Sequence, residues 1–151
     1  MFKRQVMLEC ISALLILLFL YASVSKFLDF KTFFKEMNNQ PLPNSWTPFL
    51  VWFIPCSEIL FSLALLFERT RLLGLYGSLV LMGLFTIYAI LILSHVFPYV
   101  PCSCGGVIKR LTWRQHLVLN LFFVMLSVVG IFSQRKKSFH SPIVITKNSF
   151  V

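Results

Sequence analysis

The chain has 151 residues, of which 58% are hydrophobic and only 13% are charged, and its mean hydropathy is +0.82. A chain of this length has room for one domain. Its few polar groups cannot cover the surface of a soluble protein of this size, and we therefore expect the lipid bilayer to be its solvent. The net charge of +9 does not indicate nucleic-acid binding, because the 14 basic residues lie at the ends of apolar runs and not in one patch. Two of the four cysteines lie inside apolar runs, which excludes a disulfide framework.

Four apolar runs are long enough to cross a membrane as helices at about 1.5 Å per residue. We predict spans at residues 6–27, 48–67, 72–97 and 113–132, and therefore an all-α, four-helix membrane bundle. Lys3 and Arg4 precede the first run, and Ala22-Ser23-Val24 is a poor cleavage site, which predicts an uncleaved signal anchor. The membrane domain would comprise residues 1–133, and the basic, unpatterned residues 134–151 predict a disordered cytoplasmic tail.

The segment after the first span, Asp29–Asn38, has a different pattern. Its apolar residues recur at helical spacing, with charged residues on the opposite face. The apolar residues are Phe30, Phe33, Phe34 and Met37, and the charged ones are Lys31, Lys35 and Glu36. We predict a short amphipathic helix in the membrane interface; the alternative is a loop with scattered aromatic residues.

Three local features refine the later spans. Pro55 lies inside the second span and predicts a kink there. Gly74 and Ser78 form a small-xxx-small pair that permits close helix packing in the third span. Thr112 and Gln115 have the spacing of a capping box, which predicts the start of the fourth span.

An even number of spans places both termini on one side of the membrane. That side collects eight basic residues against six on the other, including the short connection with Arg69 and Arg71 and the cluster after the last span. Because cytoplasmic loops carry the excess of Lys and Arg, we predict an inner-membrane protein with cytoplasmic termini. The turn that contains Cys102 and Cys104 then faces the periplasm or another extracytoplasmic space, where disulfides persist.

Cys102 and Cys104 are separated by one residue in the predicted turn Pro101–Gly106, between two spans. Residues two apart in an extended chain approach the upper limit for a disulfide, about 7 Å between Cα atoms, so the turn must bend for the bond to close. Such a small ring is strained, and strained, exposed disulfides are labile and often catalytic. Lys109 and Arg110 favour a thiolate. We interpret the pair as catalytic; the alternatives are free thiols or an inert bridge.

Glu58 lies near the middle of the second span, where an ionised carboxylate must be paired or lie in a polar cavity. His116 and Asn120 share one face of the fourth span with Ser127 and are candidate partners. Lys26 is another candidate, although we expect its side chain to snorkel to the outer interface. Glu58 is either a proton-handling or ligand-binding group or a buried hydrogen-bonding group that fixes helix register.

Two further interpretations concern the surroundings of the sulfurs. His95 and His116 flank the cysteine turn, so a zinc or copper site is an alternative, although one-residue cysteine spacing is unusual for zinc. We favour redox chemistry without a metal. Cys56 lies part-way into the second span, where it either resolves a mixed disulfide or is a small apolar filler.

Three motifs resemble the MauE/DoxX-like membrane proteins over about Met7–Phe132: Lys26 at the end of the first span, Pro55-x-x-Glu58, and Pro101–Gly106. MauE is implied to act with a thioredoxin-like partner in forming the disulfides of periplasmic methylamine dehydrogenase. The resemblance therefore implies a redox role for Cys102 and Cys104, whereas members often have an aromatic residue at the position of Gly105.

The expected function is thiol–disulfide exchange with a thioredoxin-like or client protein in the periplasm. Transfer of electrons to a quinone is suggested only by analogy with other four-helix disulfide oxidases, since no residue indicates a quinone site. Two other classes stay open: a non-catalytic assembly factor for a periplasmic enzyme, and a metal-binding or transport protein.

Overall fold

The computed structural model describes residues 2–97 and 112–139. Within these ranges the chain forms α1 (Phe2–Leu28), α2 (Phe30–Asn38), the short 3-10 helix η1 (Asn44–Trp46), α3 (Thr47–Leu66), α4 (Arg71–Leu93) and α5 (Trp113–Phe139). No strand occurs in this part of the chain. The helices α1, α3, α4 and α5 are long and apolar enough to cross a membrane. The predicted all-α bundle of four membrane helices is confirmed.

Two helix ends differ from the predicted spans. Helix α4 ends at Leu93 and not at residue 97, because His95 adopts a left-handed conformation with φ of 52° that a helix cannot contain. Helix α5 continues to Phe139, so the first residues of the predicted tail are helical. Residues Gln134–Lys137 end the apolar run without ending the helix, since Gln, Arg and Lys are good helix formers. Cys102, Cys104 and residues 140–151 lie outside the described residues.

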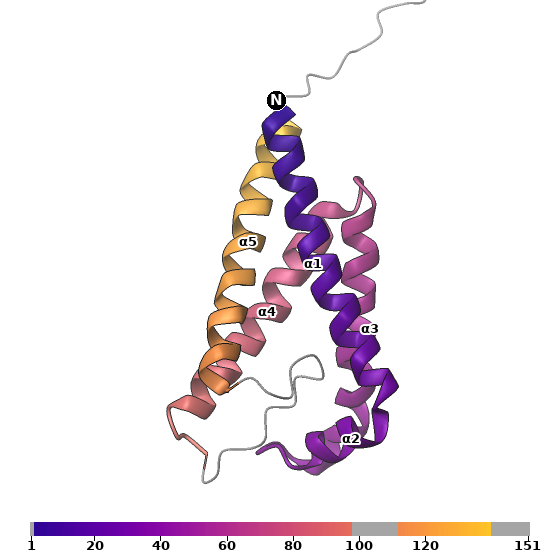
Figure 1. Ribbon diagram of the computed structural model, residues 1–151, viewed down its shortest axis with the longest axis vertical. Coiled ribbons are helices and arrows are strands. Elements are labelled where there is room, and N and C mark those ends of the chain that lie inside the picture. The colour runs from indigo at the N-terminus through magenta and orange to yellow at the C-terminus, as the bar shows by residue number, and fades with distance from the viewer. Residues whose placement is uncertain (1, 98–111, 140–151) are drawn as a thin grey trace, which may run out of the picture.

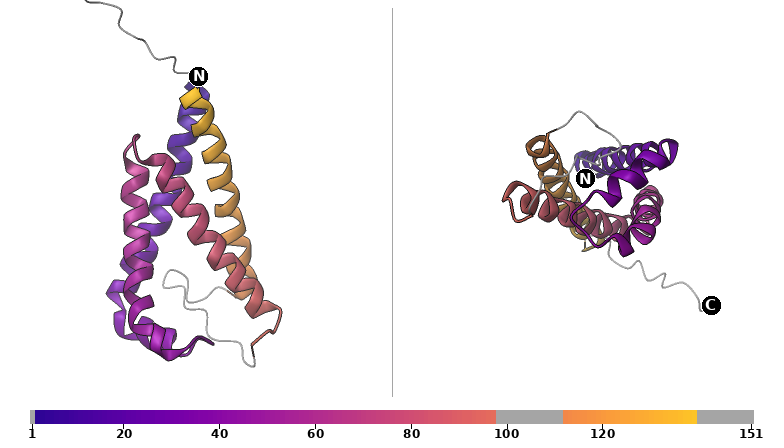
Figure 2. Two further views of the ribbon diagram at one scale, coloured as in Figure 1. Left: turned by 180° about the vertical axis from the view of Figure 1, so that it is seen from behind. Right: turned by 90° about the horizontal axis from the view of Figure 1, so that it is seen from below.

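The bundle has a narrow end and a wide end (Figure 1). Helix α1 packs along α3, and α4 packs along α5. The start of α1 and the end of α5 lie together at the narrow end, as an even number of spans requires. Helices α3 and α4 are joined by a short turn on the same side and diverge toward the wide end, where α2 lies (Figure 2). Which end faces the cytoplasm stays a prediction.

Glycines set the close approach of α3 and α4 beside their turn. A Cβ atom on Gly74 would lie 2.8 Å from the backbone nitrogen of Leu65, and one on Gly77 would lie 2.3 Å from the ring of Phe61. The close packing predicted from Gly74 is therefore confirmed. Farther along α4, a Cβ atom on Gly83 would meet nothing within 4 Å. The two helices touch tightly at one end only.

Helix α2 is the predicted amphipathic helix. Phe33 and Met37 on its apolar face are buried against Val51 of α3, while Lys31 and Lys35 are exposed. The helix thus uses its apolar face to pack on α3 at the wide end of the bundle. This placement explains why so short a helix is stable, since packing and not propensity supplies most helical stability.

The predicted capping box starts α5. The backbone nitrogen of Thr112 donates to Oε1 of Gln115 at 2.9 Å, and the backbone nitrogen of Gln115 lies 3.4 Å from Oγ1 of Thr112. Each side chain thereby serves a backbone donor that the first helical turn leaves without an intrahelical partner. The box fixes where α5 begins, directly after the segment that carries the two cysteines.

Most buried hydroxyl groups in the spans bond to their own helix. Ser62, Ser78, Thr86 and Ser127 each donate to the carbonyl four residues earlier, at 2.7–2.9 Å. These bonds satisfy the side chains locally, so they call for no partner on another helix. The buried charged groups at the wide end are different.

Candidate functional site: a buried ion pair in an open cavity

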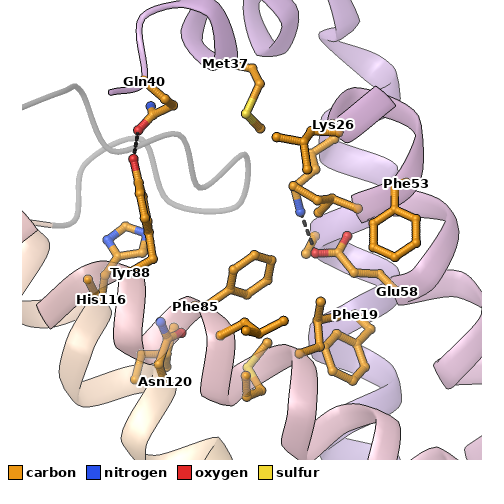
Figure 3. A pocket seen from close by; sticks show the side chains of 18 of the residues that line it. Phe19, Lys26, Met37, Gln40, Phe53, Glu58, Phe85, Tyr88, His116 and Asn120 are labelled. Carbon is orange, nitrogen blue, oxygen red and sulfur yellow. Dashed lines mark hydrogen bonds and ion pairs between the residues drawn. The ribbon is translucent and has the colours of Figure 1, made fainter. Parts of the chain in front are cut away.

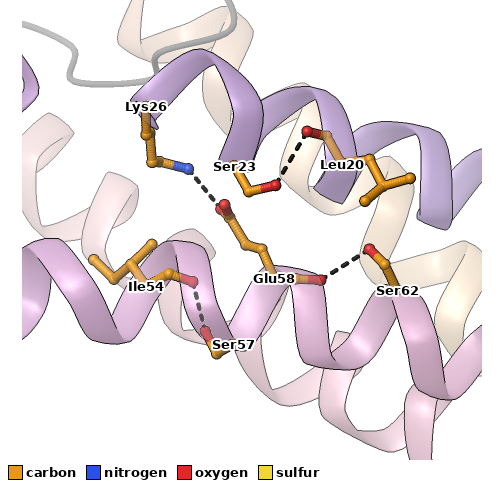
Figure 4. Close-up of polar contacts among 7 residues, drawn as sticks. All are labelled: Leu20, Ser23, Lys26, Ile54, Ser57, Glu58 and Ser62. Carbon is orange, nitrogen blue, oxygen red and sulfur yellow. Dashed lines mark hydrogen bonds and ion pairs between the residues drawn. The ribbon is translucent and has the colours of Figure 1, made fainter. Parts of the chain in front are cut away.

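Glu58 and Lys26 form a buried ion pair between α3 and α1. Lys26 Nζ lies 2.6 Å from Glu58 Oε1, and the two side chains are only 8% and 2% exposed, respectively (Figure 4). Glu58 lies roughly 16 Å along α3 from its start, near the middle of the span. The polar setting expected for this mid-span carboxylate is therefore an ion pair.

The prediction that Lys26 snorkels to the interface is wrong. The Cα–Cβ bond of a helical residue points toward the helix N-terminus, and Lys26 lies two residues before the C-terminal end of α1. Its side chain therefore extends back into the bundle, where Glu58 is within reach. The attraction and the hydrogen bond of the pair offset part of the cost of taking both charges out of water.

The second carboxylate oxygen of Glu58 is an open acceptor. Oε2 is buried and has no hydrogen-bond partner among the residues that the structure describes. The hydroxyl groups nearby serve the backbone: Ser62 donates to the carbonyl of Glu58, Ser57 to that of Ile54, and Ser23 to that of Leu20 (Figure 4). A buried carboxylate that accepts one bond where it has room for more is poised to accept another from a ligand.

This ion pair borders a cavity of about 370 Å³ to which all five α-helices contribute side chains (Figure 3). Most of the lining is apolar, and much of it is aromatic. The labelled apolar side chains are Phe19, Met37, Phe53 and Phe85. The wide end of the bundle therefore encloses a predominantly apolar space with charged groups on one side.

A second polar group lies across the cavity from the ion pair (Figure 3). The hydroxyl of Tyr88 on α4 donates to Oε1 of Gln40, which follows α2. Trp113 packs edge-on to Tyr88 with ring centroids 6.0 Å apart, and His116 lies 6.1 Å from Trp113 by the same measure. Asn120, one turn beyond His116, also lines the cavity. The predicted polar face of the fourth span is confirmed as facing the inside of the bundle.

The cavity opens on the flank of the bundle between α3 and α4. Three of its lining residues are largely exposed: Phe53 of α3 at 51%, Leu84 of α4 at 59%, and Leu42 after α2 at 36%. Helices α3 and α4 diverge on this side (Figure 2). Since both helices are long and apolar enough to span a membrane, this opening is positioned to face lipid.

Residues 4–133 match the family model for methylamine utilisation protein MauE. The chain belongs to the MauE family. The comparisons with curated proteins and with solved structures gave no match. The matched region of this MauE-family protein contains the ion pair, the helices that line the cavity, and the two cysteines between α4 and α5.

The remaining predicted site residues are dispersed. His95 is exposed and does not line the cavity, so the structure does not bring it to His116. Cys56 is a free, exposed thiol on the outer face of α3, and Cys10 is likewise free and exposed. In the part of the chain that the structure describes, no three His, Cys, Asp or Glu residues are grouped as metal ligands. The resolving role of Cys56 stays a prediction.

Sequence reasoning missed Gln40, Tyr88 and Trp113 as members of the site. The tyrosine inside the third span could have indicated a polar contact there, because its hydroxyl needs a hydrogen-bond partner when the ring is buried. Gln40 lies 48 residues from Tyr88, directly before Pro41 in a connection, and nothing in the local sequence links it to α4.

Proposed function

We propose that this MauE-family membrane protein carries out thiol–disulfide exchange with extracytoplasmic proteins through Cys102 and Cys104. The observation that carries the proposal is the family match, which includes both cysteines and the helices around the cavity. A second support is proximity along the chain, since Cys104 precedes the start of α5 by only nine residues and Trp113 there borders the cavity. In the sequence, Cys102 and Cys104 lie between the end of α4 and the start of α5, both of which are at the wide end of the bundle.

The proposed exchange begins with the pair as a disulfide. A thiolate of the partner attacks one sulfur, the bond between Cys102 and Cys104 breaks, and the released thiolate takes up a proton. The second thiol of the partner then loses its proton and attacks the mixed disulfide, which frees the other cysteine. The partner leaves with a disulfide, and the pair retains two electrons and two protons as a dithiol. Partner and pair exchange roles when the pair starts reduced.

The partner is proposed to be a thioredoxin-like protein or a client in the periplasm. This assignment depends on an inner-membrane orientation with cytoplasmic termini, which the excess of basic residues at the narrow end supports. The family description names methylamine utilisation. The structure does not bring His95 to the cavity that His116 lines, so we favour exchange chemistry over a metal site shared by these residues and the cysteines.

Thiol trapping in native membranes tests the proposal. A Cys10→Ser/Cys56→Ser variant leaves only the proposed pair, and a membrane-impermeant maleimide is added before and after mild reduction. We expect labelling only after reduction, and single Cys102→Ser or Cys104→Ser variants to label without it. Labelling of the intact pair without reduction would exclude a resting disulfide, and no labelling in either condition would exclude the orientation.

If the protein were a non-catalytic assembly factor, the substitutions would have the opposite effects on activity. Under our proposal, Cys102→Ser abolishes disulfide formation in the client while the protein level in the membrane is unchanged. An assembly factor would tolerate Cys102→Ser and would fail when helix packing is disturbed at Gly74. Measuring client oxidation in both variants, with protein levels as the control, separates the two functions.

A further inference from the structure

The cavity at the wide end has the properties of a small-molecule site. Its volume of about 370 Å³ lies within the range of roughly 300–1,000 Å³ of ligand pockets. It combines an apolar lining with a few polar groups at defined places, which is the usual composition of such sites. Glu58 lines this space, and its buried Oε2 accepts no hydrogen bond from the residues that the structure describes.

The charges at the site favour a neutral ligand. Lys26 and Glu58 neutralise one another, so a ligand with a net charge would bring an uncompensated charge into an apolar cavity. Tyr88 and Gln40 on the other side are neutral as well. A neutral molecule with a small polar group fits this balance without a desolvation cost for charge.

The hydrogen-bonding groups specify a hydroxyl. Glu58 Oε2 is an acceptor and requires a donor, while Lys26 Nζ has three N–H groups and uses one on Glu58 Oε1. A hydroxyl satisfies both, because it donates to Oε2 and accepts from Nζ. An ether or a carbonyl oxygen satisfies only Lys26, and a hydrocarbon chain satisfies neither.

The lining and the opening specify the rest of the molecule. Aromatic side chains from all five α-helices border the cavity: Phe19 of α1, Phe33 of α2, Phe53 of α3, Phe85 and Tyr88 of α4, and Trp113 of α5. Aromatic rings pack favourably on one another in offset or edge-on arrangements. The opening between α3 and α4 is positioned to face lipid, so a ligand would enter from the bilayer and leave an apolar tail there.

We propose that this cavity binds a neutral, membrane-soluble molecule with an aromatic hydroxyl head group, held by the Lys26–Glu58 pair, and an apolar tail. This binding does not depend on the cysteines. If the proposed thiol–disulfide function also holds, a quinol is the member of this class with a redox role. Its quinone form would take two electrons and two protons from the dithiol of Cys102 and Cys104, which would leave a disulfide and the quinol.

A series of three probes tests the inference on the purified full-length protein in lipid nanodiscs. The probe 4-nonylphenol has a hydroxyl, 4-nonylanisole has an oxygen that only accepts, and nonylbenzene has neither. Saturable binding is followed by tryptophan fluorescence, since Trp113 borders the cavity. We expect the phenol to bind at least tenfold more tightly than the ether, because the bond to a charged acceptor is lost. Equal binding of all three probes would overturn the proposal in favour of a cavity filled by acyl chains.

A charge-neutral variant locates the head group. Lys26→Met/Glu58→Met removes both polar groups with little change of volume and should abolish the preference for the phenol while nonylbenzene binding persists. The control Lys31→Met, on the exposed face of α2, should retain the preference. A preference that survives in the double variant would place the hydroxyl elsewhere and refute the assignment. Cys102→Ser/Cys104→Ser should bind all probes like the wild type, which separates this inference from the proposed function.

Discussion

The Lys26–Glu58 pair permits a quantitative prediction about stability. At the observed 2.6 Å and an effective dielectric constant of about 20, the attraction between the two charges is roughly 6 kcal/mol. Desolvation of both groups offsets much of this gain. Removing one partner loses the attraction but leaves the other charge buried, which typically costs about 3–5 kcal/mol. We therefore expect Lys26→Met to lower the free energy of unfolding by about that amount.

Removing the carboxylate of Glu58 should cost less than removing the ammonium group of Lys26. Lys26 lies two residues from the end of α1, so without its partner it can turn toward the interface on its flexible stem. Glu58 is near the middle of α3 and has no such route. We expect Glu58→Met to be clearly milder than Lys26→Met. The double variant Lys26→Met/Glu58→Met should lose less than the sum of the two, with a coupling of about 2 kcal/mol or more.

Equilibrium unfolding of the purified protein in mixed detergent and SDS micelles, followed by far-UV circular dichroism, measures all three variants. Lys31→Met and Glu9→Met repeat the chemical changes at exposed positions and should stay within about 0.5 kcal/mol of the wild type. A Lys26→Met variant as stable as these controls would refute the reasoning. A loss of stability in the double variant equal to the sum of the two single losses would also refute it, because the two charges would then not interact.

Substitutions at other sites test three separate mechanisms in the same assay. Gly74→Ala places a Cβ atom against the backbone of Leu65 and should cost about 1–3 kcal/mol, whereas Gly83→Ala, with open space, should be neutral or stabilising. Thr112→Ala removes half of the capping box and should cost about 1 kcal/mol. Tyr88→Phe removes the hydroxyl that donates to Gln40 and should cost about 1 kcal/mol.

The spans and the amphipathic helix were predictable because their signals are local. An apolar run long enough to cross the bilayer defines a span, and the spacing of Phe30, Phe33 and Met37 defines an apolar face over two turns. The inward face of α5 followed from the same periodicity, which placed His116 and Asn120 correctly. In each case the physical cause lies within one continuous stretch of the sequence.

The centre of the site depends on contacts that no local pattern encodes. Lys26 and Glu58 are 32 residues apart, and the sequence alone made both interfacial snorkelling and pairing plausible for a lysine near a span end. The direction of its Cβ atom and the side-by-side packing of α1 and α3 decided between them. Periodicity identifies which face of a helix is buried, but it does not identify the facing residue.

The shape of the cavity follows from how α3 is held at its two ends. At the narrow end a short turn and Gly74 bring α3 and α4 into contact, and at the wide end α2 packs on α3 through Phe33 and Met37. Between them α4 presents Phe85 and Tyr88 to the cavity. A buried ion pair seldom adds stability over apolar residues of the same size. Its position on the wall of a space kept open by packing therefore points to ligand binding and not to stability as the reason it is there.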